Sequence, residues 1–253
     1  MKATYSDLKN KRVFISGGGS GIGATIVEHF CEQNSEVYFI DINVKASKKL
    51  ISNIKKKKKR VPKFIECNIL DIKKLQNIIK NIIANKGPIH CLINSAANDD
   101  SHATEQVDEK YWENRMGINL KHYFFAAQSV VKGMKKIKSG SIVNLSSVSW
   151  MLGEGDKVVY ETAKSAVIGL TRSFAQEFGK YNIRTNSVIP GSIATERQIK
   201  NWLTPKYKKL ILDSQALKRQ LKPDDVARLV LFLSSDQSSG CTKQSFIIDA
   251  GIT

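Results

Sequence analysis

The sequence predicts one α/β domain: a doubly wound parallel sheet of about seven strands with helices on both faces. Two observations carry this prediction. Short apolar runs alternate with longer helix-period segments along residues 1–253, and no Pro-, Gly- or Ser-rich linker interrupts them. The apolar runs are nearly continuous in hydrophobicity, as strands buried on both faces should be. Strand–helix alternation with this rhythm indicates right-handed βαβ units.

Seven runs rich in Val, Ile and Phe are the predicted strands, and helical candidates lie between them. The strands cover 12–16, 36–40, 63–67, 89–94, 141–146, 184–189 and 245–249. The helices lie near 21–33, 44–57, 71–84, 109–136, 157–179 and 223–234. The segment 191–222 departs from the rhythm. Loops of that length in compact domains are commonly lids or binding loops, so we expect a substrate lid there.

Composition indicates a globular protein with reduced thiols. Apolar residues make up 42% of the chain and charged residues 25%, which is ordinary for globular domains. The cysteines Cys31, Cys67, Cys91 and Cys241 are scattered, so we expect neither a disulfide framework nor a metal site. The N-terminus lacks an apolar signal core, and the chain has no apolar run long enough for a membrane span. We therefore expect a cytoplasmic protein without a membrane partner.

The formal net charge of +17 raises the question of nucleic-acid binding. The densest basic run, Lys55 to Arg60, follows an amphipathic stretch and has no aromatic residues interleaved with it. Aromatic side chains are the stacking platforms that bind single strands. We therefore expect no nucleic-acid partner, and we interpret the charge as a surface property that favours solubility and attracts anions in general.

A glycine pattern follows the first strand directly. Gly17, Gly21 and Gly23 lie between this strand and a predicted helix, with Ser20 and Ile22 among them. Glycine lets backbone N–H groups approach a pyrophosphate closely, and the helix N-terminus adds partial positive charge. Because the strand-before, helix-after context is met, the pattern predicts a Rossmann-type dinucleotide site.

The second strand ends at Asp41, which bears on the choice of cofactor. An acidic side chain at this point accepts both hydroxyls of the adenine ribose and repels a 2′-phosphate. Neither Ser20 nor Ile42 is basic, so nothing obvious attracts that phosphate. The sequence therefore favours NAD over NADP.

Tyr160 and Lys164 lie four residues apart, on one face of a predicted helix. A phenol has a pKa near 10, too high for an efficient base at neutral pH. A nearby ammonium favours the phenolate and lowers that pKa. Ser147 ends the strand before this helix, Asn119 lies on the helix before that strand, and the P-G-S-I-A-T stretch at 190–195 follows the next strand.

With these features the chain resembles the short-chain dehydrogenase/reductase family along essentially its whole length. The resemblance implies that Tyr160 is the acid/base and that Ser147 orients and polarises the reacting oxygen. Lys164 would lower the tyrosine pKa and hold the nicotinamide ribose. Asn119 would anchor a water-linked proton relay. The resemblance also implies cofactor contacts from Asn68, Ile69, Asn94, Ala96, Pro190, Gly191, Ile193 and Thr195, the last to the carboxamide.

Two positions depart from the family pattern. The family's N-N-A-G after the fourth strand is here Asn94-Ser95-Ala96-Ala97, so the second asparagine is lost. The adenine-contacting aspartate after the third strand is Asn68, whose side-chain oxygen can still accept from the adenine amine. Neither change touches the reacting groups.

Polar residues gather where the fourth strand ends, at the sheet edge where ligands bind in this fold. Asn98, Asp99, Asp100 and His102 offer the donors and acceptors that a polyhydroxylated ligand needs. Ser149 and Glu154 are further candidate substrate contacts, Trp150 could stack on a sugar ring, and Trp202 could close over the ligand. A simpler alternative is that Asp99 and Asp100 cap the next turn and that Trp202 packs within the lid.

Stretches from the N-terminus to the last strand, among them "AANDDSH", "SWMLG" and "TERQIKNWLTP", resemble the NAD-dependent sugar 1-dehydrogenases within this family. The resemblance implies oxidation of a cyclic aldose at C1 to its lactone, with Tyr160 as the base, and a homotetramer. Three alternatives stay open. The chain could be a 3-oxoacyl-carrier-protein reductase, another alcohol or ketone short-chain dehydrogenase, or a binding protein that keeps the fold without the chemistry.

Overall fold

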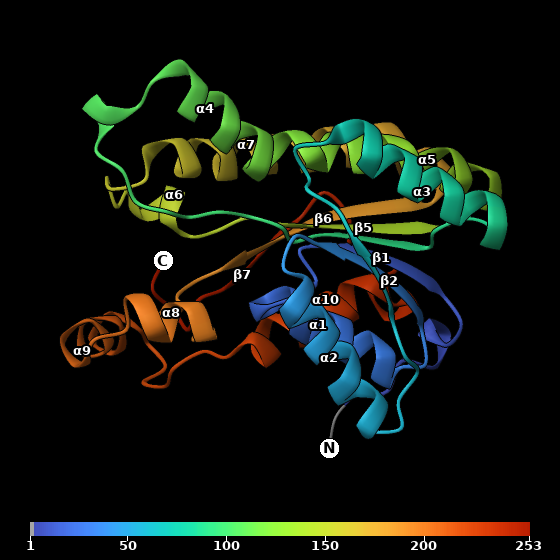
Figure 1. Ribbon diagram of the computed structural model, residues 1–253, viewed down its shortest axis with the longest axis horizontal. Coiled ribbons are helices and arrows are strands. Elements are labelled where there is room, and N and C mark those ends of the chain that lie inside the picture. Colours follow the sequence, from blue (N-terminus) through green and yellow to red (C-terminus); the bar gives the residue numbers. More distant parts are fainter. Residues whose placement is uncertain (1–2) are drawn as a thin grey trace.

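A computed structural model, which describes residues 3–253, contains one sheet of seven parallel strands in the order β3-β2-β1-β4-β5-β6-β7 (Figure 1). The strands are β1 (Arg12–Ser16), β2 (Glu36–Asp41), β3 (Lys63–Glu66), β4 (Cys91–Asn94), β5 (Gly140–Leu145), β6 (Ile183–Pro190) and β7 (Ser245–Ile248). The doubly wound sheet predicted from the sequence is confirmed. Strand order reverses between β1 and β4, and ligands of such sheets bind at this point.

Helices cover both faces of the sheet. In Figure 1, α3 (Ile72–Lys86), α5 (His122–Ile137) and α7 (Val158–Phe178) lie on one face, and α1 (Gly21–Glu32), α2 (Val44–Lys56) and α10 (Pro223–Ser234) lie on the other. Successive side chains of a strand point to opposite faces. Val13 and Ile15 accordingly belong to the core under α1 and α10, whereas Phe14 belongs to the core under α3 and α5. Both faces are therefore apolar and buried, as the continuous apolar runs predicted.

The prediction of one helix over 109–136 is wrong in one respect. The structure has α4 (Glu109–Met116), then a π-helical segment, Gly117–Lys121, and then α5. A π turn holds an extra residue, which changes the direction of side chains without breaking the apolar pattern. Gly117 lies in this segment with the Leu70 side chain against it, since a Cβ there would lie 2.7 Å from Leu70 Cδ2.

The segment 191–222 folds into two short helices, α8 (Glu196–Asn201) and α9 (Pro205–Ser214). Each helix has a threonine cap, because Thr195 Oγ1 accepts from Gln198 N and Thr204 Oγ1 accepts from Tyr207 N. The two ends of the segment are tied together, since Ala194 N donates to Leu221 O at 2.9 Å. In Figure 1 the pair α8–α9 extends to one side of the sheet, opposite α4 and the short helix α6 (Ser149–Leu152).

The thiols are free, as the sequence indicated. Cys31, Cys67 and Cys91 are buried, and Cys241 is partly exposed. Burial raises the pKa of the Cys31 and Cys91 thiols to about 12, which keeps them protonated and unreactive. Within residues 3–253, no helix combines the length and the apolar character needed to cross a membrane.

Candidate active site

The glycine loop after β1 is built on close backbone contacts. Gly17 has φ +69°, and a Cβ on it would lie 2.6 Å from Ala96 Cα. A Cβ on Gly23 would overlap the carbonyl oxygen of Gly17. Both positions therefore require glycine. The helix α1 starts at Gly21, and its cap residue Ser20 makes no side-chain hydrogen bond to the first-turn N–H groups. The Ser20 side chain thus does not compete with an anion for these N–H groups.

Asp41 lies at the end of β2 beside this loop. Its Oδ2 accepts a hydrogen bond from Gly19 N at 2.8 Å, and its Oδ1 accepts from Asn43 N at 2.8 Å. These two N–H groups fix the carboxylate against the glycine loop. Ser47 lies close by, with a buried hydroxyl that has no hydrogen-bond partner.

The other predicted cofactor residues near β1 to β3 lie in the first turn of α1 and directly after β3. Ile22 is in the first turn of α1 and packs against the core. Asn68 is exposed after β3, and its Oδ1 accepts from Leu70 N at 3.0 Å. Ile69 packs beside it against the opposite core.

Asn94 and Ala96 follow β4 on the other side of β1. Asn94 is fully buried, and its Nδ2 donates to Asn144 Oδ1 at 2.8 Å. The turn after it is held by Ser16, whose Oγ accepts from Ser95 N at 3.1 Å and from Ala96 N at 3.3 Å. Sequence reasoning did not identify Ser16. The signal was available, since a hydroxyl residue ends an otherwise apolar strand just before the glycine loop.

The residues after β6 meet the glycine loop. Gly191 N donates to Ile248 O at 3.0 Å, and a Cβ on Gly191 would lie 2.8 Å from Asp249 Cα. Pro190 O accepts from Val148 N at 3.0 Å, and Ile193 forms a bridge with Leu221. Thr195 lies beside the start of α1, because a Cβ on Gly21 would lie 3.3 Å from Thr195 Cγ2.

Ser147, Tyr160 and Lys164 come together at the carboxyl end of β5, and with Tyr123 we call them the floor of the site. Ser147 Oγ accepts from Ser149 N at 3.2 Å and from Ser149 Oγ at 3.0 Å, and it is hydrogen-bonded to the Tyr160 phenol. Lys164 Nζ lies 5.6 Å from the centroid of the Tyr160 ring. The predicted acid/base, its serine neighbour and the lysine thus share one place.

The pKa values on the floor are governed by burial. Burial lowers the pKa of Lys164 from 10.5 to about 7, against the favourable charge of Asp99. Burial also raises the pKa of Tyr160 above its usual value, as does Asp99, whereas the hydrogen bond with Ser147 lowers it. The predicted lowering of the Tyr160 pKa is therefore not found in this arrangement. Desolvation outweighs an ammonium that is not hydrogen-bonded to the phenol.

Two adjacent residues of α5 were not predicted from the sequence: Tyr123 of the floor and His122 next to it. The Tyr123 hydroxyl accepts from Lys164 Nζ at 3.0 Å and donates to Leu145 O at 2.9 Å. His122, also fully buried, lies 3.4 Å from Ser16 Oγ through its Nε2. Burial and the nearby Lys164 lower the pKa of His122 to about 3, so the imidazole is neutral.

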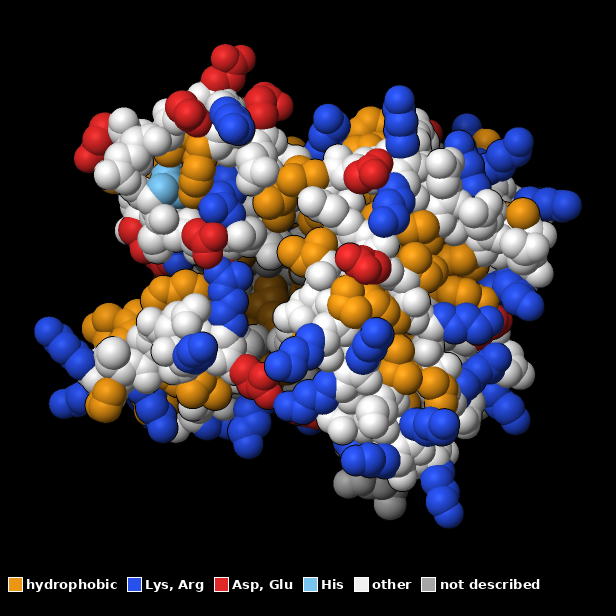
Figure 2. Space-filling model, in the orientation of Figure 1, with side chains coloured by type: hydrophobic (Ala, Val, Ile, Leu, Met, Phe, Trp, Pro, Cys, Tyr) orange, Lys and Arg blue, Asp and Glu red, His pale blue; other side chains and the backbone are white. Residues whose placement is uncertain are grey.

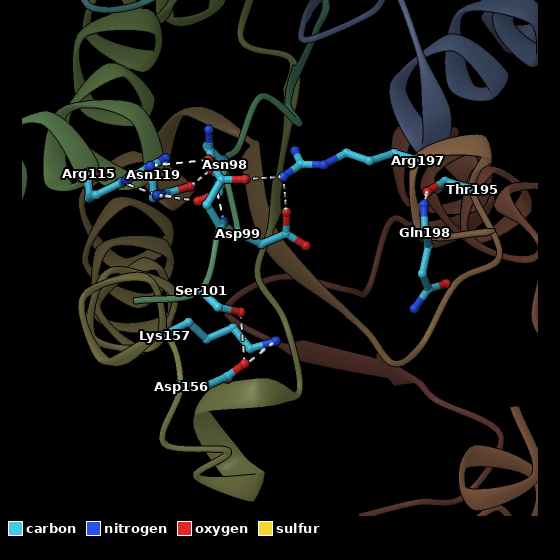
Figure 3. A network of polar contacts seen from close by, with 11 residues as sticks. Asn98, Asp99, Ser101, Arg115, Asn119, Asp156, Lys157, Thr195, Arg197 and Gln198 are labelled. Carbon is cyan, nitrogen blue, oxygen red and sulfur yellow. Dashed lines mark hydrogen bonds and ion pairs between the residues drawn. The ribbon is translucent and has the colours of Figure 1, made fainter. Parts of the chain in front are cut away.

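Asn119 lies in the π segment and is fully buried. Its Oδ1 accepts from Asn98 N at 2.9 Å, and its Nδ2 donates to Asn98 O at 3.0 Å and to Arg115 O at 3.1 Å. The amide therefore clamps the backbone of the loop that follows β4 (Figure 3).

Charged side chains surround the opening above the floor, and we call Asp99, Asp100, Arg115, Glu154, Lys157 and Arg197 the mouth. Arg197, from α8, reaches across to this loop and pairs with Asp99 Oδ1 at 3.1 Å and Asp100 Oδ1 at 2.5 Å (Figure 3). Arg115 pairs with Asp100 Oδ2 at 3.1 Å. Burial would raise the pKa of Asp100, but the hydrogen bond with Asn98 and the charge of Arg197 hold it below its usual value. The two aspartates are thus paired with arginines. Neither is the cap residue of the next 3-10 turn, Thr104–Gln106, or of α4, because these cap residues are Ala103 and Asp108.

The remaining polar residues of the opening also have protein partners. The His102 ring is hydrogen-bonded through Nδ1 to Tyr111 Oη at 3.0 Å, and its Nε2 lies 3.4 Å from Val159 N at the start of α7. Glu154 pairs with Lys157 at 2.7 Å.

The two tryptophans differ in their surroundings. Trp150 has a buried indole N–H without a hydrogen-bond partner, so it has a donor to offer. Trp202 has the Arg197 guanidinium 5.1 Å from its ring centroid, so it packs within the 191–222 segment. Figure 2 shows the molecule hollowed beside this segment, between it and the side that carries α1 and α2.

Comparisons with known proteins show the family of this chain. The family model described as "Enoyl-(Acyl carrier protein) reductase" matches residues 17–253. The chain is 42% identical over 249 residues to a D-xylose 1-dehydrogenase of Caulobacter vibrioides, with 98% of each chain covered. It is 39% identical over 248 residues to the "Probable galactose dehydrogenase GalD" of Rhizobium meliloti, covering 98% of this chain and 97% of that one.

A solved structure has the same fold. The 3-oxoacyl-[acyl-carrier protein] reductase of Brucella melitensis matches with a TM-score of 0.90 and 26% identity, over 98% of this chain and 93% of that one. The chain belongs to the short-chain dehydrogenase/reductase family. As a member of this family it is an oxidoreductase that acts on CH–OH donors.

Proposed function

We propose that this protein oxidises the C1 hydroxyl of a cyclic aldose to the aldonolactone, with NAD as the hydride acceptor. The observation that carries the proposal is the floor, where Ser147, Tyr160 and Lys164 lie together beneath a polar opening. The unpartnered indole N–H of Trp150 is a donor for a sugar oxygen. The two sugar dehydrogenases above match this chain along nearly their whole length, which supports the same substrate class.

The residues present fit a dinucleotide. Close backbone contacts at Gly17 and Gly23 shape the glycine loop, and the N-terminus of α1 lacks a side-chain cap, so an anion can accept hydrogen bonds from its N–H groups. The Asp41 carboxylate, fixed beside this loop, suits ribose hydroxyls and repels a 2′-phosphate. Lys164 retains an N–H for a ribose hydroxyl. When bound between these residues, the dinucleotide would supply the acceptor for the hydride from the sugar C1.

Residues of the chain itself remove the proton of the sugar C1 hydroxyl. Ser147 holds the C1 oxygen beside Tyr160, and the phenolate of Tyr160 takes the hydroxyl proton as the C1–H bond breaks and the carbonyl forms. Lys164, when protonated, favours that phenolate. The Asn119 amide is hydrogen-bonded to Asn98 and to Arg115 O. We therefore propose that this amide positions the loop after β4, in addition to the role of Asn119 in anchoring a water-linked proton relay.

The proposal includes the organisation of the chain. Residues 1–253 act as one domain, and the segment 191–222 acts as a lid over the substrate, because its ends are tied and Arg197 links it to the loop after β4. We further propose a cytoplasmic homotetramer that pairs through α7 and the helices before it. The exposed Trp112 and Phe124 on α4 and α5 support such pairing.

The experiment is a panel of aldopentoses, aldohexoses and deoxysugars, with NAD and NADP in parallel, followed by the absorbance of the reduced nicotinamide. We expect turnover of aldoses with NAD and a clear preference for one C2–C4 stereochemistry. No turnover of any sugar by protein that binds NAD would contradict the aldose proposal and leave the family intact.

The cofactor part has its own variant. Asp41→Ala should lower the kcat/KM for NAD about tenfold, because one charged hydrogen-bond partner of the ribose is lost. The kcat/KM for NADP should rise. The ratio of the two kcat/KM values is internally controlled, because general damage lowers both. An unchanged ratio would remove Asp41 from cofactor selection.

A second candidate is a 3-oxoacyl-carrier-protein reductase. The net charge of +17 favours it, since carrier proteins are acidic and a basic surface attracts them. The polar mouth is unfavourable for an acyl chain. Reduction of an acetoacetyl thioester with NADPH, together with no turnover of aldoses, would establish this candidate instead.

A further inference from the structure

Lys164 is held in a buried triangle of polar atoms that has no role assigned in the proposed reaction. Its Nζ donates to the Tyr123 hydroxyl at 3.0 Å and to Leu145 O at 2.8 Å, and the same hydroxyl donates to Leu145 O at 2.9 Å. Tyr123 is fully buried and Lys164 is 1% exposed. Three polar atoms from α5, α7 and β5 thus form hydrogen bonds with one another away from solvent.

An ammonium has three hydrogens to donate. Two are taken by Tyr123 and Leu145, and within residues 3–253 the third has no protein acceptor. In an ammonium without fixed acceptors, rotation about the Cε–Nζ bond leaves the directions of the three hydrogens undefined. With two acceptors fixed on separate elements, the direction of the third hydrogen is fixed as well.

We propose that Tyr123 is a positioning residue: its hydroxyl holds the Lys164 ammonium in place and stabilises its charged form. The inference rests on the proposed roles of Tyr160 and Lys164. A Phe side chain at this position would fill the same space and lack the acceptor. The hydroxyl, and not the ring, is therefore the functional group.

The groups that face Lys164 come from four elements: Tyr160 on α7, Tyr123 and His122 on α5, Asp99 in the loop after β4, and the Leu145 carbonyl on β5. His122 is neutral above about pH 3, and burial raises the pKa of both tyrosines above 10. Between these limits, Lys164 is the group of this set whose charge state Tyr123 influences, because the Tyr123 hydroxyl is hydrogen-bonded to its Nζ.

Tyr123→Phe is the test, and it has two readouts. Loss of one acceptor disfavours the buried ammonium, so the pKa of Lys164 falls further and the positive charge that favours the Tyr160 phenolate is lost. In sugar oxidation the midpoint of the kcat–pH profile should then move up by about one unit, and kcat at neutral pH should fall about tenfold. The KM for the sugar should change little.

The second readout needs no substrate. Wild type and Tyr123→Phe should differ in unfolding free energy by a constant amount above about pH 7, where Lys164 is neutral in both. Below about pH 7 the gap should widen, because the variant buries a charge with one acceptor fewer. In a Lys164→Met background the same substitution should give a gap that does not vary with pH.

Tyr38→Phe is the matched control. Its hydroxyl also accepts from a lysine, Lys63 Nζ, at 3.1 Å, and it lies on β2 away from the floor. It should not shift the kcat–pH profile, and its unfolding gap to the wild type should stay constant near pH 7. Its own pH dependence belongs to the acidic range in which Glu36 titrates, because the Tyr38 hydroxyl donates to Glu36 Oε1 and, against the effect of burial, lowers the pKa of that carboxyl. A Tyr123→Phe variant with wild-type profiles in both readouts would overturn the proposal. If the wild type oxidises no alcohol, the proposed function fails, and the unfolding readout still decides the role of Tyr123.

Discussion

The floor and the mouth of this site are adjacent, yet they are built on opposite principles. On the floor, Lys164 is 1% exposed and Tyr123 is fully buried, and the Lys164 ammonium on α7 is held by the Tyr123 hydroxyl on α5 and by Leu145 O on β5. At the mouth, the side chains of Arg197 and Asp100 are 43% and 47% exposed, and their ion pairs link the 191–222 segment to the loop after β4.

This difference indicates a division of labour. Exposed ion pairs contribute little stability and can break and re-form at low cost, whereas a buried polar group that loses its partner is expensive. The floor is therefore suited to fixed positioning of the reacting groups. The mouth is suited to opening and closing around substrates of somewhat different shape.

The largest expected effect tests the floor directly. Tyr160→Phe removes the proposed base and leaves the ring in place, so kcat should fall on the order of 10³-fold. NAD binding, followed by fluorescence titration, should be unchanged. If kcat stays at the wild-type level, the residues of the floor do not carry out the reaction, and the difference between floor and mouth has no functional meaning.

Lys164→Met should sharpen the comparison by separating activity from stability. We expect a loss of kcat of about 10²-fold, because the phenolate loses its positive neighbour. The fold should survive, since the Tyr123 hydroxyl still donates to Leu145 O. Chemical denaturation at a series of pH values measures the second part.

The sign of this pH dependence follows from the lowered pKa of Lys164. The unfolded chain keeps this proton up to about pH 10.5, whereas the folded chain loses it above about pH 7. The cost of burial is therefore fully present below about pH 7, shrinks as the pH rises toward 10.5, and is absent above that value. Lys164→Met should gain on the wild type as the pH falls from 10.5 to 7. A gap that is constant over this window would mean that Lys164 is solvated.

The smallest effect belongs to the mouth. Arg197→Gln removes the link to Asp99 and Asp100, so the KM for the sugar should change about three- to fivefold with little change in kcat. Added salt should move the wild-type KM toward that of the variant, because exposed charges are screened.

Arg228→Gln is the control for that variant. Arg228 and Arg219 share Asp225, much as Arg197 and Arg115 share Asp100, but they lie outside the mouth. The control should leave KM and its salt dependence unchanged. A kcat loss in Arg197→Gln as large as that in Lys164→Met would show that mouth and floor are one unit.

Local pattern was sufficient for most of the fold. The strands could be predicted because parallel strands buried on both faces are apolar throughout, and Gly17 and Gly23 because close backbone approaches require glycine. The π segment was missed, since Gly117–Lys121 continues the helical apolar pattern and an extra residue in one turn leaves no compositional trace.

In the site, the sequence indicated the residues that we propose as reacting groups and missed the residues that contact them, Tyr123 and Arg197. Tyr123 reads as one more aromatic residue in an apolar helix, and its hydroxyl gains a role only when α5 packs beside α7. Arg197 is separated from Asp100 by 97 positions, so their pairing depends on where the 191–222 segment folds back. The local sequence around Tyr123 or Arg197 therefore does not indicate which residue each side chain contacts in the fold.

The strand order has a consequence for how such a protein can evolve. Under the proposed function, cofactor choice depends on Asp41 and the glycine loop, on the β1–β2–β3 side of the reversal. Substrate choice depends on residues from Asn98 onward, on the β4–β7 side. One stretch of the gene can therefore accumulate substitutions for a new sugar while the other stays under selection for the same nucleotide. Exchange of the first stretch between relatives would be a route to the other cofactor in a single recombination.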